Sequence, residues 1–484
     1  MNPLKQLLGQ SAIYGLSSVV GRLLNYLLVP LYTRVFSPFE YGEVSVLYAY
    51  AALLLVVLTY GMETAYFRFS QTHTPKKAFS TALFSLVIST SAFFFLLAVA
   101  LAPISQALSF GHQPAYIQYM GLIVGLDALT AMAFAKLRQE QKAWHFASIR
   151  LVNILINIGL NLFFIVYCPH VLSQGSSNAL VSAVYNPQLG IAYIFIANLV
   201  ASAITFVIVL PQLLDVDWRF DRSLWMKMMP YALPLMLAGL AGMVNETLDR
   251  VLLNSLLPSD VAASEIGLYS AFYKLSIIMT LFVQTFRFAA EPFFFAQATQ
   301  RDAKAIYAKV MKYFFIVTAF IFLAVTMYYD IVKQFIGSEF HDPRGALIVP
   351  ILLFANLLLG VYYNLSVWYK LTEKTIYGAW ISVFGAGITI VMNVLLIPSL
   401  GFVGSAWATL CCYFLMVVCS YFLGRKHYPI AYPLARMATY FVLMMCLYFI
   451  STAWPMGMGI NSLYLLFFVG IAWALERPKK NVTS

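Results

Sequence analysis

Charged residues are scarce in this sequence, since only 10% of its 484 residues are charged and 62% are hydrophobic. A soluble domain has about 25% charged residues, so this balance excludes a soluble globular protein. The five cysteines show no CxxC spacing and the six histidines stand singly, so we expect no metal site. The composition predicts an all-α integral membrane protein.

The sequence also lacks the residue groupings on which catalysis or ATP hydrolysis depends. No nucleophile and base stand at a characteristic spacing, no phosphate-binding loop is present, and Gly385 and Gly387 fall inside an apolar run. The net charge is +11, but no block of lysine and arginine or aromatic RNA-binding motif accompanies it. We therefore expect no enzyme, no ATP-driven pump, no nucleic-acid partner and no bound cofactor.

Apolar runs long enough to cross a bilayer follow one another along the whole chain. They predict about fourteen transmembrane helices. These lie near 11–33, 41–62, 79–102, 115–135, 146–167, 189–210, 230–256, 266–288, 311–331, 346–368, 376–397, 402–423, 433–450 and 461–475. No stretch between them is long enough for a soluble domain.

Basic residues gather on one side of the predicted membrane. With a cytoplasmic N-terminus, 22 of the 30 basic residues fall in cytoplasmic segments, whereas the outer loops hold Arg34, Lys333 and Arg344. This bias follows the positive-inside rule. It predicts that both termini are cytoplasmic.

Two halves of the sequence match at equal offsets. Lys142 and Asn161 are as far apart as Lys374 and Asn393, and a Leu-Gly pair follows each asparagine. The second and eighth helices likewise begin at Tyr41-Gly42 and Gly267-Leu268, and Thr33-Arg34-Val35 matches Asp249-Arg250-Val251.

Such a repeat predicts two six-helix lobes in the same orientation. Parallel-repeat transporters have this pattern, with the substrate site between the halves. The predicted regions are an N-lobe at 1–229, a C-lobe at 230–430, and two further helices with a cytoplasmic tail at 431–484.

Ionisable residues inside apolar helices are rare, and each is a candidate site. Arg22 shares one helix face with Gly15, Ser18 and Asn25. An arginine at a helix centre costs roughly 2.5–3.5 kcal/mol. Two interpretations stay open: this face lines a cavity, or Arg22 forms a structural ion pair with Asp127 of the fourth helix.

A second polar stripe follows the fifth helix and has a counterpart on the eleventh. Its members are Arg150, Asn153, Asn157 and Asn161, and the matching residues are Ser382, Gly385, Thr389 and Asn393. The stripe either lines the cavity or supplies hydrogen bonds between helices, at ~0.6–2 kcal/mol each.

Charged residues on the first, seventh and eighth helices complete the candidate set. Arg34, Arg250 and Lys274 are the cations. Glu246, one turn before Arg250, and the adjacent Asp249 are candidates to neutralise Arg250. Snorkelling toward the membrane surface is the competing explanation for Lys274.

Two further pairs of opposite charge stand near helix ends. Arg287 and Glu291 are four residues apart just before Pro292, and Glu63 and Arg68 close the second helix. The four-residue spacing of Arg287 and Glu291 predicts an ion pair within the helix. Glu63 and Arg68 are interpreted in the same way, as an ion pair at a helix end.

Several motifs, taken as an ordered set, resemble those of a known family. They are Pro30-Leu31-Tyr32-Thr33-Arg34, Ser37-Pro38, Glu40-Tyr41-Gly42, Asp249-Arg250, Gly267-Leu268-Tyr269-Ser270, Tyr273-Lys274-Leu275 and Gly404-Ser405-Ala406. The set resembles the bacterial polysaccharide-transporter family, the oligosaccharide-lipid flippases of the multidrug/oligosaccharidyl-lipid/polysaccharide exporter superfamily. The resemblance covers helices 1–12 and implies two lobes that form a V-shaped central cavity and alternate their access.

This resemblance implies a flippase that moves polyprenyl diphosphate-linked oligosaccharide to the outer leaflet of the bacterial cytoplasmic membrane. In the related lipid II flippases, cavity arginines bind the lipid diphosphate, a role that the resemblance extends to Arg22, Arg34 and Arg250. The expected partners are the lipid-linked glycan, membrane lipids and other polysaccharide-assembly proteins. Coupling to the membrane potential, protons or sodium stays open.

Two other functions compete with this one. A multidrug or cation antiporter of the same superfamily requires a net acidic cavity, whereas cations outnumber Asp127 and Glu246 here. A polysaccharide polymerase or ligase typically presents a large external loop with basic residues, and the loops here are short and nearly uncharged.

Overall fold

The computed structural model describes residues 20–174, 179–298, 300–454 and 457–477. Within these ranges every regular element is a helix, and 13 helices are long and apolar enough to cross a membrane. This confirms the predicted all-α membrane fold. The first predicted helix, 11–33, lies partly outside the described residues. Its residues 20–26 are helical and lead through a turn into α2 (Val29–Val35).

The chain divides into two compact units, one ending at Leu268 and the other beginning at Tyr269. The helix α12 therefore groups by packing with the first unit, although the sequence repeat assigns it to the second lobe. The lobes at 1–229 and 230–430 remain a prediction based on the repeat.

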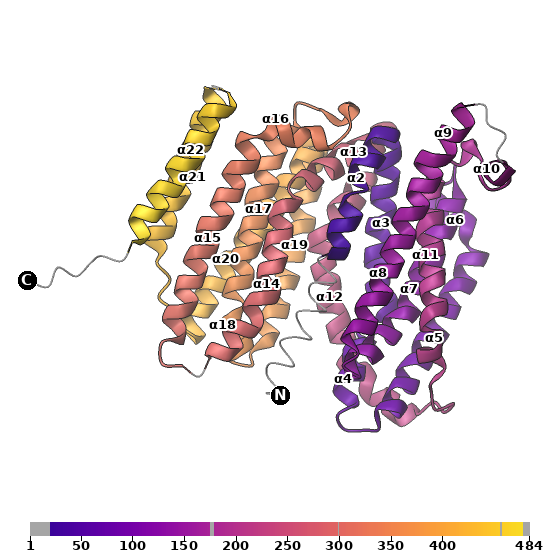
Figure 1. Ribbon diagram of the computed structural model, residues 1–484. Helices are drawn as coiled ribbons and strands as arrows, with labels where there is room; N and C mark the ends of the chain where they lie inside the picture. Colours follow the sequence, from indigo (N-terminus) through magenta and orange to yellow (C-terminus); the bar gives the residue numbers. More distant parts are fainter. Residues whose placement is uncertain (1–19, 175–178, 299, 455–456, 478–484) are drawn as a thin grey trace, which may run out of the picture. The chain divides into compact units, whose positions relative to one another are not determined.

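Figure 1 shows the helices of the first unit from indigo to magenta. They are α2, α3 (Pro38–Thr59), α4 (Met62–Phe69), α5 (Pro75–Val99), α6 (Leu101–Ala107), α7 (Pro114–Gln139), α8 (Ala143–Leu162), the π-helix η1 (Phe163–Tyr167), α9 (Cys168–Ser173), α10 (Ala179–Val184), the 3-10 helix η2 (Pro187–Leu189), α11 (Ala192–Leu214), α12 (Arg222–Leu256) and the start of α13 (Ser259–Leu275).

Helix α7 is the centre of the first unit. The helices α3, α5 and α11 pack against it, α11 also packs on α8, and α12 packs on α3 and α4. Small and apolar side chains such as Ala128, Met132 and Ala133 on α7 are fully buried. Because lipid tails are as apolar as these side chains, close van der Waals packing rather than hydrophobic burial holds such helices together.

The helices α3 and α13 cross at two glycines. A Cβ atom at Gly42 would lie 1.7 Å from the carbonyl oxygen of Ala263, and one at Gly267 would lie 1.8 Å from that of Pro38. Any larger residue would collide with the backbone of the other helix. These glycines begin the second and eighth helices of the sequence repeat, so matching positions of the two copies contact each other.

The second unit is coloured from pink through orange to yellow in Figure 1. Its helices are the end of α13, α14 (Ile277–Gln297), α15 (Ala303–Met327), α16 (Tyr329–Val332), the 3-10 helices η3 (Lys333–Phe335) and η4 (Ser338–Phe340), α17 (Gly345–Leu365), α18 (Val367–Leu371), α19 (Thr375–Leu400), α20 (Phe402–His427), α21 (Leu434–Ala453) and α22 (Met458–Glu476). The helix α17 is central here, because α14, α15 and α20 pack against it, and α19 packs on α20.

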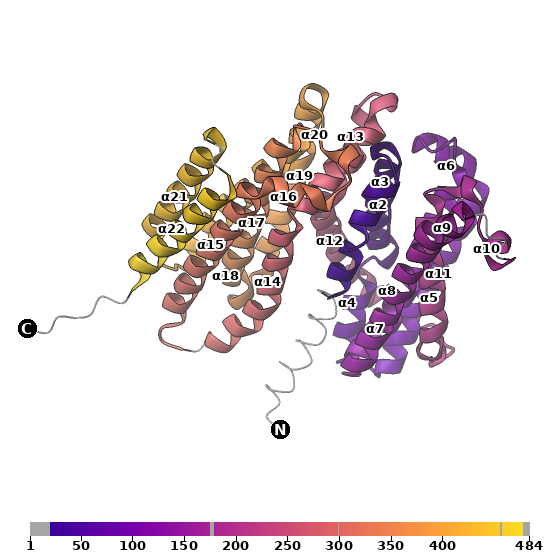
Figure 2. The ribbon, with the colours of Figure 1, turned by 45° about the horizontal axis from the view of Figure 1, so that its top comes forward.

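The two C-terminal helices, predicted as an appendage, lie beside α15 (Figures 1 and 2). Lys312 of α15 forms an ion pair with Glu476 at the end of α22. The hydroxyl of Tyr440 on α21 donates a 2.7 Å hydrogen bond to the same carboxylate. One carboxylate therefore joins α15, α21 and α22.

The helix predicted over 266–288 is interrupted in the structure. The helix α13 ends at Leu275 and α14 begins at Ile277, so a turn at Ser276 divides the predicted span. The Ser276 hydroxyl donates a 2.7 Å hydrogen bond to the carbonyl of Tyr273. A serine side chain that competes for a backbone carbonyl in this way often bends a helix.

Candidate functional site

Two of the predicted arginines lie together in the first unit. Gly21 lies against α8, where a Cβ atom would be 2.8 Å from Cδ1 of Ile154. Arg150 precedes Ile154 by about one helical turn, and its charge interacts with that of Arg22. Both arginines are exposed on the surface of the protein. The first unit thus presents two guanidinium groups within apolar helices.

Arg150 is also linked to Asp127. Its guanidinium carbon lies 5.0 Å from the ring centroid of Phe134 and 5.7 Å from that of Phe146. Asp127, on α7, accepts a 2.9 Å hydrogen bond from the hydroxyl of Ser202 on α11. The charge of Arg150 acts on Asp127, so Arg150 is an electrostatic partner of this carboxylate.

The asparagines of the polar stripe form hydrogen bonds within the protein. Asn153 donates to the hydroxyl of Thr205 on α11 at 2.8 Å, and Asn161 accepts from the hydroxyl of Tyr32 at 2.8 Å. Asn161 also donates to the side chain of Asn157 at 3.1 Å. For Asn153 and Asn161 the structure therefore favours the second interpretation, in which polar residues join helices.

Arg250 is buried in this conformation, with 9% of its surface exposed. Its Nη1 atom lies 3.0 Å from Oδ1 of Asp249 and donates to the backbone carbonyl of Glu246 at 3.2 Å. Arg34, Asn25 and Glu246 are exposed. Of the first-unit candidates, Arg22, Arg34 and Arg150 are thus accessible cations, whereas Arg250 faces Asp249.

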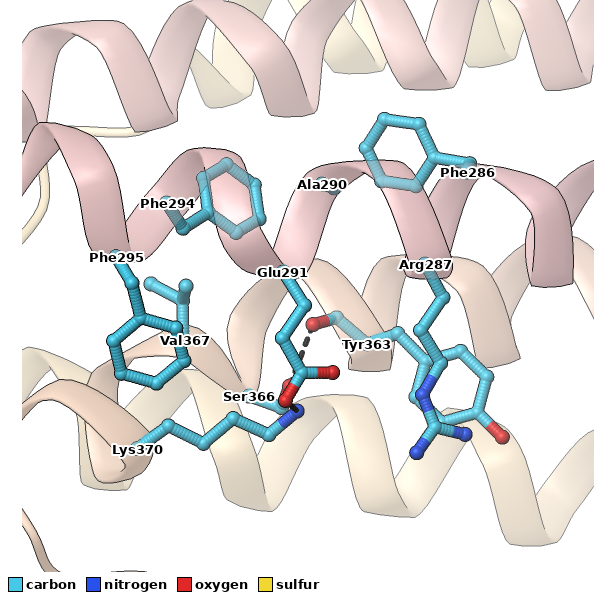
Figure 3. Close-up of a pocket in the computed structure, with 10 residues that line it drawn as sticks. All are labelled: Phe286, Arg287, Ala290, Glu291, Phe294, Phe295, Tyr363, Ser366, Val367 and Lys370. Carbon is cyan, nitrogen blue, oxygen red and sulfur yellow. Dashed lines mark hydrogen bonds and ion pairs between the residues drawn. The ribbon is translucent and has the colours of Figure 1, made fainter. Parts of the chain in front are cut away.

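In the second unit, Lys274 is half-buried in the last turn of α13. A separate group of charged residues lines a small cavity where α14 meets α17 and α18 (Figure 3). The lining residues are Phe286, Arg287, Ala290, Glu291, Phe294, Phe295, Tyr363, Ser366, Val367 and Lys370.

The ion pair predicted between Arg287 and Glu291 is wrong. Glu291 pairs with Lys370 of α18 at 2.9 Å, and the guanidinium of Arg287 lies 4.4 Å from the ring centroid of Tyr363 (Figure 3). Both side chains point toward α17 and α18, where a lysine and an aromatic ring offer closer partners than the next turn of their own helix.

The pair predicted between Glu63 and Arg68 is wrong for the same reason. Glu63 forms its ion pair with Arg138 near the end of α7. The guanidinium of Arg138 also lies 5.2 Å from the ring centroid of Phe67. A neighbouring helix again supplies the partner that spacing along one helix cannot reveal.

Arg287 and Lys370 were absent from the predicted site. A signal for Lys370 exists in the sequence, because Tyr363, Ser366 and Lys370 recur at helical spacing and share one face. Lys370 is one of the 22 basic residues that the positive-inside rule places in cytoplasmic segments, so its place on this helix face was not predicted.

The helical fold and its apolar spans define the class of protein: a multi-pass membrane protein. The chain belongs to the family described as "Polysaccharide biosynthesis protein", which matches residues 7–297. This match confirms the resemblance found in the sequence. No curated protein sequence matches the chain.

Solved structures of a flippase and of transporters have a similar fold. The lipid II flippase MurJ in an inward closed conformation has a TM-score of 0.71 at 12% identity, covering 95% of this chain and 98% of that one. An inward-facing multidrug resistance MATE transporter of the MOP superfamily has a TM-score of 0.61 at 12% identity, covering 87% and 95%. The Vibrio cholerae MATE transporter VcmN in its bent form has a TM-score of 0.52 at 14% identity, covering 88% and 97%. The chain therefore shares the fold of these transporters and of this flippase.

Proposed function

We propose that this protein moves a polyprenyl diphosphate-linked oligosaccharide from the cytoplasmic to the outer leaflet of the bacterial inner membrane, for the synthesis of cell-surface polysaccharide. The family match and the fold similarity to a lipid II flippase support this proposal. The observation that carries it is the pair of exposed arginines, Arg22 and Arg150, within apolar helices. Each costs roughly 2.5–3.5 kcal/mol at a helix centre, a cost that an anionic substrate offsets.

A diphosphate suits this pair of guanidinium groups. Each guanidinium presents a rigid fork of N–H donors that binds two phosphate oxygens at once. The sugar head cannot enter hydrocarbon, so it requires a polar route, while the polyprenyl tail stays in lipid. Alternating access of two lobes, with both termini in the cytoplasm, provides such a route.

The energy for outward movement can come from the membrane potential. An inside-negative potential favours outward transfer of a negative head by ~2.3 kcal/mol per charge per 100 mV. A coupling ion is therefore optional in this proposal. Asp127 is the candidate for coupling to protons or sodium, since it is a carboxylate within a span that contacts Ser202.

The proposal is tested with purified protein in liposomes containing a polyprenyl diphosphate-sugar. Arg22→Ala and Arg150→Ala are expected to reduce binding and translocation by at least tenfold. Arg22→Lys is expected to restore part of the activity, since an ammonium replaces a bidentate fork. The control is Arg219→Ala, which removes an exposed cation between α11 and α12. Wild-type translocation by both alanine variants would contradict the proposal.

A multidrug or cation antiporter is the second candidate, because the fold is also similar to MATE transporters. Asp127 would then be the essential residue and Arg22 dispensable. Proton- or sodium-driven efflux of a cationic dye, lost in Asp127→Asn and retained in Arg22→Ala, would establish the antiporter instead.

A further inference from the structure

The cavity between α14 and α17–α18 has an unusual charge pattern that the first-unit arginines do not explain. Two cations, Arg287 and Lys370, line it together with one carboxylate, Glu291. Arg287 and Glu291 both point from α14 toward the neighbouring helices, and Lys370 reaches back to Glu291 (Figure 3). The group carries one more positive than negative charge.

The ion pair between Lys370 and Glu291 is exchangeable. The side chains of Lys370 and Glu291 are 23% and 41% exposed. Water screens a pair exposed to this extent, and such pairs contribute little to stability. Another anion that reaches the cavity can therefore compete with Glu291 for the ammonium group.

Arg287 keeps its hydrogen-bonding capacity in its present position. It lies over the face of the Tyr363 ring, with the guanidinium carbon 4.4 Å from the ring centroid, a cation–π contact. A guanidinium presents a planar fork of N–H donors, which suits a planar or tetrahedral anion. The Ser366 hydroxyl, by contrast, already donates to the carbonyl of Tyr363 at 2.6 Å.

The apolar lining of the cavity indicates what kind of molecule carries the anion. Phe286, Phe294 and Phe295 form part of its wall. Aromatic and apolar walls beside two cations suit an amphiphile with a phosphate at its polar end. Basic pockets between transmembrane helices on the cytoplasmic side bind anionic lipid head groups.

The size of the cavity shows that the occupant must displace Glu291. With the ion pair closed, the cavity has a volume of about 20 Å³, which is room for about one water molecule. A phosphate group does not fit beside the closed pair. Docking therefore requires that the Glu291 carboxylate move away from Lys370.

We propose that this cavity is a phosphate-docking site for a membrane lipid, in which the lipid phosphate replaces Glu291 at Lys370 and is held between Lys370 and Arg287. The phosphate belongs either to the lipid-linked glycan or to an anionic phospholipid, since both carry the same chemistry. The first of these sources rests on the proposed function, and the second does not.

The test measures lipid binding to the full-length protein by native mass spectrometry. The two probes are a polyprenyl diphosphate-sugar and phosphatidylglycerol, each added to protein in neutral phosphatidylcholine. Lys370→Gln and Arg287→Gln are each expected to weaken binding of at least one probe by about tenfold. Glu291→Gln removes the competing carboxylate and is expected to strengthen binding of the same probe several-fold. Lys374→Gln, at a nearby exposed lysine, is the matched control.

Opposite effects of Glu291→Gln and Lys370→Gln separate docking from a merely structural ion pair, because loss of a structural pair from either side would act in the same direction. A response of the glycan lipid alone identifies the substrate as the occupant, and a response of phosphatidylglycerol identifies a head-group site. If neither probe responds to Lys370→Gln, or if Glu291→Gln weakens binding, the proposal is overturned. Failure of the proposed function is distinguishable, since glycan translocation would then be missing from wild-type protein while phosphatidylglycerol still bound in this cavity.

Discussion

Asn161 on α8 and Asn393 on α19 occupy matching positions of the sequence repeat, and the structure makes them a direct comparison of the two halves. Both are fully buried, and both donate a 2.8 Å hydrogen bond to the carbonyl four residues earlier, that of Asn157 or Thr389. Asn161 additionally accepts from Tyr32, whereas Oδ1 of Asn393 has no donor within the described part of the chain.

The repeats also differ in sequence at the position of the donor. At the offset that matches Arg34 with Arg250, Tyr32 corresponds to Leu248, which has no hydroxyl. Both copies therefore keep the hydrogen bond from the asparagine to the backbone carbonyl one turn earlier. Among the described residues, the hydrogen bond from a tyrosine of another helix is present in the first copy and absent from the second. Repeat symmetry predicts local geometry here better than it predicts long-range contacts.

The two copies also place their charges on different helices. In the first unit the stripe on α8 carries Arg150, but its counterpart on α19 is Ser382, which donates to the carbonyl of Gly378 at 3.0 Å. In the second unit the cations of the Figure 3 cavity are on α14 and α18. The two units therefore carry differently built groups of cations.

The largest expected effect is a loss of stability when the crossing of α3 and α13 at Gly42 and Gly267, the matching positions of the repeat, is disrupted. Gly42→Ala and Gly267→Ala each place a methyl group on a backbone carbonyl oxygen that cannot rotate away. We expect a loss of about 3 kcal/mol or more of stability, measured as a lower unfolding temperature and less protein in the membrane. Gly387→Ala is the control, because nothing lies within 4 Å of the Cβ position there. Wild-type stability of Gly42→Ala would show that the helices separate more easily than this crossing indicates.

The next effect tests whether the two polar stripes differ in function. Arg150→Met keeps a long side chain against Phe134 and Phe146 but removes the charge, and it is expected to lower glycan-lipid translocation by at least tenfold. Ser382→Ala, at the matching position, is expected to change translocation by less than twofold. Translocation in liposomes at equal protein density measures both. Equal losses would mean that the two stripes serve the same role.

A smaller effect tests the hydrogen bond that only the first copy possesses. Tyr32→Phe leaves the buried Oδ1 of Asn161 without its donor, which costs about 1–3 kcal/mol. Asn393→Leu is expected to cost less, because the Oδ1 atom that it removes already has no donor. Thermal unfolding in detergent measures the two variants side by side. A greater loss in Asn393→Leu than in Tyr32→Phe would reverse the comparison.

The sequence was sufficient for the spans and insufficient for side-chain partners, and particular residues show why. Apolar runs identify transmembrane helices because every backbone group in lipid must be paired within the helix. The bend at Ser276 was not predicted, since a hydropathy pattern does not register one serine hydroxyl that bonds to Tyr273. Glu291 was assigned to Arg287 by spacing along α14, but its partner, Lys370, comes from a helix whose position only the fold reveals.

The smallest expected effect concerns the ends of the helices outside the membrane spans. Asp215, which follows α11, accepts hydrogen bonds from Lys136 at 2.8 Å and pairs with Lys76 at 2.9 Å. The hydrogen bonds from Lys136 and Lys76 lower the pKa of Asp215 to about 2, below the ordinary value of about 3.9.

A carboxylate whose pKa is lower in the folded state stabilises the fold fully above its unfolded pKa, and this contribution is lost as the pH falls toward 2. The stability difference between the wild type and Asp215→Asn should therefore be constant from pH 7 to about pH 5, decrease below about pH 4 and vanish near pH 2. Unfolding of the detergent-solubilised protein across this range measures it, with Asp330→Asn, at an exposed carboxylate of the second unit, as the control. A difference that grows below pH 4 would show that Asp215 does not act through its ionised form.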